Sequence, residues 1–191
     1  NTSAISYLGF VDTRISYKGW LLTVGGSYNK LTYKRLNNST SLKKETNAFQ
    51  PILVPRIGLL KSISNSVSIL TSYSKGYSPP TVWDLEITDA LINKALQPEV
   101  GENIELGIKF KHKEKIKSSI TVFQLNTENA IVSKQLQNSN FEFSNAGFTQ
   151  QIGVEYLIQL NFKFKEWTFW NSLAYTFSEY KFKEYENEGN N

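Results

Sequence analysis

Cysteine is absent from this chain of 191 residues, and histidine occurs once, as His112. Without cysteine there can be no disulfide, no thiolate nucleophile and no thiolate metal site. A single histidine also leaves little scope for a histidine metal centre or a catalytic triad. We therefore expect no catalytic residues, no metal site and no cofactor, and we expect that the protein is not an enzyme.

Long hydrophobic runs are missing as well. No segment approaches the roughly 20 consecutive apolar residues that a membrane-spanning helix needs, and the mean hydropathy is −0.36. The chain begins at Asn1 without a basic and then apolar leader, and it ends in the polar run ENEGNN. We therefore expect it to be an internal part of a longer protein.

The charge of the chain is weakly basic, with a formal net charge of +4 and a sequence pI of about 9.1. Nucleic-acid binding would require the lysines to gather on one face or along one stripe. Most of them instead fall in or beside expected turns, as in the run from Lys109 to Lys117. We therefore expect no nucleic-acid partner.

What the sequence does contain is alternation with a period of two. Between residues 104 and 111, apolar side chains alternate with Glu105, Gly107, Lys109 and Lys111, which is typical of a strand with one apolar face. Several such segments exceed the roughly 9–11 tilted residues that cross a bilayer, whereas ordinary strands average about 5–6. About eight strands are predicted, at residues 6–17, 20–33, 52–62, 67–74, 104–111, 116–126, 147–162 and 167–182.

The connections between these strands alternate in length. Short turns are expected at Lys18–Gly19, Ser64–Asn65, Lys113–Glu114 and 163–165, and long polar loops at 34–50, 75–103 and 127–146. The second loop has a helix-like pattern within 82–96, and the third is predicted to contain a hairpin of 130–136 against 140–144. Long loops at one end and short turns at the other are typical of outer-membrane barrels. The pattern favours an all-β, antiparallel up-and-down meander that forms part of a transmembrane β-barrel.

Five segments in order carry a family resemblance: VPRIGL, SYSKGYSPPTVWDL, LQPEVGENIELGIK, TENAIV and NAGFTQQIGVE. Together they resemble the distal barrel region of TonB-dependent outer-membrane receptors. The resemblance implies that residues 1–191 are one partial barrel domain, without the family's plug domain and terminal strand, in the outer membrane of a Gram-negative cell. It implies active uptake of a scarce ligand, such as a ferric siderophore or similar metal chelate, energised by the TonB complex through the absent plug. Outer-membrane lipid is the other implied partner, and cobalamin or a glycan stays open as the ligand.

Two sets of candidate site residues follow. Tyr77, Trp83 and Asp84 lie in the longest loop and are candidates for ligand binding at the extracellular mouth, although loop packing under Pro79–Pro80 would explain them equally well. The second set is expected to face the barrel lumen in structural roles, with the glycines allowing close approach of neighbouring groups. Its members are Glu105, Gly107, Gly153 and Glu155.

Two other classes of protein fit the same pattern. A small, complete eight-stranded outer-membrane barrel with an adhesion or structural role would require residues 6–17 to pair with 167–182. A soluble carbohydrate-binding β-sandwich would require the apolar strand faces to pack on each other. The strand pairing and the exposure of the apolar faces therefore discriminate between the three.

Overall fold

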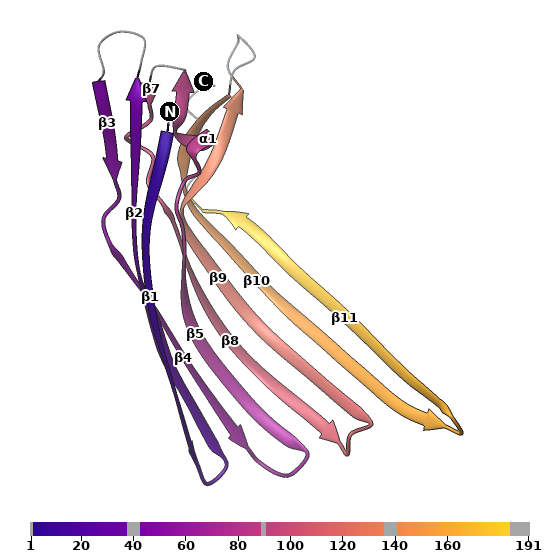
Figure 1. The fold of residues 1–191 in the computed structure, drawn as a ribbon. Helices are drawn as coiled ribbons and strands as arrows, with labels where there is room; N and C mark the ends of the chain where they lie inside the picture. Colours follow the sequence, from indigo (N-terminus) through magenta and orange to yellow (C-terminus); the bar gives the residue numbers. More distant parts are fainter. Residues whose placement is uncertain (1, 38–42, 89–90, 136–140, 184–191) are drawn as a thin grey trace.

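The computed structural model describes residues 2–37, 43–88, 91–135 and 141–183 as a curved antiparallel sheet (Figure 1). A short helix, α1 (Val82–Leu85), and a two-stranded ladder of β6 and β7 lie in the connection between β5 and β8. The strands are β1 (Thr2–Tyr17), β2 (Trp20–Asn37), β3 (Lys43–Ala48), β4 (Ile52–Ser62), β5 (Val67–Ser78), β6 (Glu86–Thr88), β7 (Leu91–Ile92), β8 (Glu99–His112), β9 (Ile116–Gln135), β10 (Phe141–Phe164) and β11 (Trp167–Phe182).

The strands of the large sheet follow the order of the chain. The order is β1-β2-β4-β5-β8-β9-β10-β11, and β3 pairs with the end of β2 that lies beyond β4. Every pairing is antiparallel, and the four short turns lie together at the lower end in Figure 1. The predicted up-and-down meander is therefore confirmed, and its eight predicted strands correspond to the eight strands of this path.

Both alternative architectures are contradicted by the described part of the chain. There, β1 pairs only with β2 and β11 pairs only with β10, so the sheet does not close on itself as an eight-stranded barrel. The apolar side chains of the strands are largely exposed and do not meet a second sheet as in a sandwich. The described part of the chain contains no helix that could span a bilayer.

The strand register gathers apolar side chains on one face of the sheet. Leu106, Val122 and Val154 lie in one row across β8, β9 and β10, and the Leu106 side chain is 54% exposed. On the opposite face, neighbouring side chains crowd the backbone, so that Gly107 and Gly153 are buried. The apolar, open face is the one suited to lipid, and the crowded face is the one suited to a barrel lumen.

Several predicted boundaries were wrong at the long-loop end. The chain from 34 to 50 is not a loop throughout, because β2 continues to Asn37 and β3 pairs with it. The hairpin predicted within 127–146 is confirmed by pairs such as Ser133 with Phe143, but it continues β9 and β10 without a break. The helix occupies only the first four residues of the predicted 82–96 region, and Ala90 lies outside the described residues. At the short-turn end, the last turn lies at 165–166 and not at 163–165, because β10 reaches Phe164.

The assignment of faces predicts unequal costs for two neighbouring substitutions in β8. Ile108→Lys should lower the free energy of unfolding by about 2–4 kcal/mol, because it places a charge against hydrocarbon. Lys109→Ile, on the lumen side, should cost much less. Unfolding in detergent or liposomes measures both, and equal penalties would contradict the assignment.

Candidate functional site

The connection between β5 and β8, residues 79–98, packs over the long-loop end of the sheet. Leu85 and Leu96 from this connection are almost completely buried. They form a small core with side chains from β2 and from the segment between β3 and β4, and residues of β9 and β10 pack against that core. The core residues are Leu31, Tyr33, Phe49, Leu85 and Leu96, with Val82, Ile131 and Phe143 at its edge.

Hydrogen bonds fasten the β5–β8 connection to strands on both of its sides. The Tyr33 hydroxyl of β2 donates to the Pro80 carbonyl at 2.7 Å, and both groups are buried. Toward β10, the Gln97 N–H donates to Asn145 Oδ1 at 2.7 Å, and Asn145 Nδ2 donates back to the Gln97 carbonyl at 2.8 Å. Asn93 Nδ2 also donates to the Phe143 carbonyl at 2.9 Å. The connection is therefore a bridge between distant strands.

The three predicted ligand-binding residues have three different surroundings. Trp83 is 79% exposed. Asp84 forms a capping box, in which its Oδ2 accepts from the Thr81 N–H at 2.7 Å while Thr81 Oγ1 accepts from the Asp84 N–H at 3.3 Å. Tyr77 was predicted to lie in the loop, but it lies in β5 and pairs with Val100 of β8, because both strands continue beyond their predicted ends. Its hydroxyl is buried without a hydrogen-bond partner among the described residues. Of the three, Trp83 has the side chain that is most open to a ligand.

Two tyrosine hydroxyls near this bridge have shifted acidity. Burial raises the pKa of Tyr33, and the nearby charge of Asp84 raises it further. Burial also raises the pKa of Tyr77, with a smaller contribution from Tyr33. The neutral, hydrogen-donating form of Tyr33 therefore persists to a higher pH than in a free tyrosine, which protects its bond to Pro80.

The predicted lumen residues lie where close packing or hydrogen bonding is needed. Glu105 accepts from Ser72 Oγ at 3.0 Å and from Asn103 Nδ2 at 2.7 Å. A Cβ added to Gly107 would lie 2.8 Å from Thr121 Oγ1.

At Gly153, an added Cβ would lie 2.5 Å from the ring of Phe123, which covers this glycine from β9. Glu155 is exposed and pairs with Thr121, on the face of the sheet that carries Gly153. The four residues predicted to face the lumen therefore share one face, and their functional role stays a prediction.

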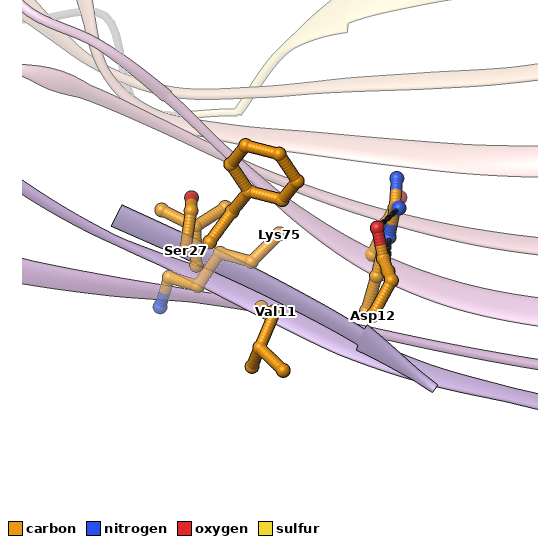
Figure 2. A pocket seen from close by; sticks show the side chains of 9 residues that line it. Val11, Asp12, Ser27 and Lys75 are labelled. Carbon is orange, nitrogen blue, oxygen red and sulfur yellow. Dashed lines mark hydrogen bonds and ion pairs between the residues drawn. The ribbon is translucent and has the colours of Figure 1, made fainter. Parts of the chain in front are cut away.

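A groove on the lumen face was not predicted from the sequence. It has a volume of about 460 Å³ and is lined by Phe10, Asp12, Ser27, Val54, Arg56 and Ser74, together with Val11, Gly26 and Lys75. In Figure 2, Asp12 and Ser27 lie on one side of the sheet, and Val11 points away from them. The groove therefore presents a charged pair and two hydroxyls beside apolar side chains.

The charged pair of this groove spans three strands. Arg56 of β4 donates through Nε to Asp12 Oδ1 of β1 at 2.8 Å, and its Nη2 contacts Oδ2 of the same carboxylate. Gly25 of β2 lies between the two in the register, so no side chain separates them. A Cβ at Gly25 would lie 2.0 Å from Asp12 Oδ1 and 2.8 Å from the Val11 carbonyl oxygen. Gly25, in the segment VGG, was the sequence feature that could have indicated this charged pair. Its partners in the sheet, Asp12 and Arg56, are 13 and 31 positions away along the chain.

Two tyrosine substitutions should distinguish a hydroxyl that makes a hydrogen bond from one that makes none. Tyr33→Phe leaves the buried Pro80 carbonyl without its donor and should destabilise the bridge by about 1–3 kcal/mol. Tyr77→Phe removes a hydroxyl that has no partner and should be neutral or slightly stabilising. Hydrogen exchange of the backbone amides in residues 79–98 measures both effects. Equal exchange rates in the two variants would contradict the hydrogen bond from Tyr33 to Pro80.

Two glycine substitutions test the spacing beneath the charged pair. Gly25→Ala should cost about 1–3 kcal/mol, because the Asp12 side chain can move but the Val11 carbonyl is backbone. Gly58→Ala is the matched control, since its added Cβ would meet only Ser72 Cβ, at 4.0 Å. Thermal unfolding in detergent should leave the control unchanged, and an unaffected Gly25→Ala variant would show that β1 and β2 are spaced differently.

Comparison with known proteins places this geometry in a family. A curated relative, the ferric-pyoverdine BN7/BN8 receptor of Pseudomonas putida, is 29% identical over 134 residues, which are 66% of this chain and 16% of the relative. Among solved structures, the FrpB iron transporter from Neisseria meningitidis (F5-1 variant, apoprotein form) has a TM-score of 0.70 and 17% identity, covering 98% of this chain and 27% of that one. The copper transporter OprC has a TM-score of 0.74 and 13% identity, covering 96% and 30%.

These likenesses agree with the sheet described above. The two solved structures show the fold, and the chain spans well under half the length of each of these proteins. All of residues 1–191 match the family described as "TonB dependent receptor-like, beta-barrel". The family consists of outer-membrane receptors of Gram-negative bacteria and not of enzymes. The chain therefore belongs to the TonB-dependent receptor β-barrel family.

Proposed function

We propose that residues 1–191 form part of the wall of a larger receptor barrel that takes up a ferric siderophore or a similar metal chelate, energised through TonB. The observation that carries this proposal is the similarity to a ferric-pyoverdine receptor over 134 residues. A second relative, the ferripyoverdine receptor of Pseudomonas aeruginosa, is 28% identical over 87 residues. The resemblance of the copper transporter OprC is one of fold, so it does not favour a second ligand.

The open sheet supports the larger barrel. Among the described residues, the outer edges of β1 and β11 have no strand beside them. Inside hydrocarbon, every backbone N–H and C=O needs a partner, and a closed barrel supplies one. We infer that further strands continue the sheet at both edges, and that the plug domain that couples such receptors to TonB also lies outside residues 1–191.

The long-loop end is the part of this wall where we place ligand contact. The exposed Trp83 ring can stack on the aromatic or conjugated part of a metal chelate, a contact that contributes about 0.5–1.5 kcal/mol. The buried core of Leu85 and Leu96 holds the β5–β8 connection in place behind it. Asp84 then shapes the connection through its capping box with Thr81, and Trp83 meets the ligand.

The test is uptake of labelled ferric siderophores by cells that lack their own receptors and express the outer-membrane protein containing residues 1–191. Uptake should occur with TonB and disappear without it. Trp83→Ala should weaken ligand binding about 2–10-fold, the loss expected from one stacking contact. Trp167→Ala, an exposed tryptophan at the short-turn end, is the control and should leave binding unchanged.

Two outcomes would contradict the proposed function, and a third would contradict only the placement of ligand contact at Trp83. Uptake that persists without TonB would show that TonB does not energise the transport. Transport of copper but of no ferric chelate would assign the protein to another ligand class. Equal binding by the Trp83→Ala and Trp167→Ala variants would remove Trp83 from the site while leaving the transport function standing.

A further inference from the structure

The short-turn end of the sheet carries a concentration of lysine just beyond a band of aromatic side chains. Most of these lysines are exposed, and the acidic residues among them are Glu114 and Glu166. The band contains exposed rings of Tyr17, Trp20, Phe110, Phe162, Phe164, Trp167 and Phe169. The lysines, called here the basic rim, are Lys18, Lys61, Lys111, Lys113, Lys115, Lys117, Lys163 and Lys165.

Three lysines at the short-turn end adopt a backbone conformation that lysine seldom adopts. Lys18, Lys113 and Lys165 begin three of the short turns with φ angles of 44°, 50° and 51°. Positive φ at such positions is ordinarily occupied by glycine, asparagine or aspartate, because other side chains are strained there. Farther along β9, where the chain adopts the same conformation, the residue is Asn129 with φ of 57°. Lysine therefore occupies these three turns despite the backbone strain of a positive φ.

Three rim lysines also lie against rings of the aromatic band. Lys61 Nζ is 4.7 Å from the centre of the Trp20 ring, Lys18 Nζ is 5.2 Å from that of Tyr17, and Lys165 Nζ is 5.7 Å from that of Phe164. Aromatic rings at a membrane interface lie at the level of the lipid headgroups. Ammonium groups beside them are therefore held at the height of the lipid phosphates.

The positive charge of the basic rim is only partly neutralised within the protein. Glu114 pairs with Lys111 at 2.8 Å and with Lys117 at 3.4 Å, and these two lysines lower the pKa of its carboxyl group. Among the described residues, Lys113, Lys115 and Lys163 have no acidic partner. The rim is therefore left with uncompensated cations that face the headgroup level.

We propose that the basic rim is a docking surface for the phosphate groups of anionic phospholipids in the membrane leaflet at the short-turn end. Basic clusters next to a membrane-spanning region attract anionic headgroups in this way. The proposal rests on the outer-membrane location and not on the ligand or on TonB, so it can fail while the proposed uptake function stands.

The test uses the outer-membrane protein containing residues 1–191, purified in detergent, and titrates it with phosphatidylglycerol or phosphatidylcholine. Native mass spectrometry counts the bound lipids. Phosphatidylglycerol should bind more tightly than phosphatidylcholine at low salt, and the difference should shrink in high salt. The triple variant Lys18→Asn, Lys113→Asn, Lys165→Asn should lose about tenfold or more in affinity for phosphatidylglycerol alone.

Asparagine is chosen because it suits positive φ, so the turns should fold at least as well as before. The control variant, Lys30→Gln, Lys94→Gln, Lys183→Gln, removes the same charge from exposed lysines away from the short-turn end and should keep the lipid preference. A triple turn variant that retains wild-type affinity would overturn the proposal. Displacement of phosphatidylglycerol by inorganic phosphate at constant ionic strength would also overturn it, because the rim would then be a site for small anions.

Discussion

Pairing of backbone groups between strands is the constraint on which the rest of this structure depends. In hydrocarbon, an N–H or C=O without a partner costs several kcal/mol, so a spanning strand must be bonded along its length. β10 meets this requirement on both sides, since residues 149–160 pair with β9 and with β11 at once. Strand length, fixed register and the separation of an apolar from a polar face all follow from such continuous ladders.

The membrane part of the fold was predictable because its determinants are local. A period of two assigns faces from a few neighbouring residues, as from Ile104 to Phe110 in β8. A two-residue turn then fixes the register of a whole strand pair. Because Lys18 and Gly19 form the turn, Tyr17 pairs with Trp20, and this first pair determines all the others between β1 and β2. Registers of this kind need no information from distant parts of the chain.

The long-loop end was less predictable because its contacts join distant positions through side chains. The bond from Tyr33 to Pro80 spans 47 residues, and that from Asn93 to Phe143 spans 50. The Asp12–Arg56 pair, 44 residues apart, was missed for the same reason, although Gly25 marks the crossing. By contrast, the capping role of Asp84 was readable from the local Thr81–Asp84 spacing, and its contact with a ligand stays a prediction.

The two ends of the sheet thus differ in the side chains that they carry and are suited to different tasks. At the short-turn end, turns of minimal length carry lysines against aromatic rings, which suits a fixed position at a lipid surface. At the long-loop end, the β5–β8 connection is held by its own small core and by bonds to β2 and β10, and it contributes no strand to the large sheet. The exposed face of that connection, where Trp83 lies, can therefore change in sequence without breaking any hydrogen bond of the ladders that hold the sheet in the membrane.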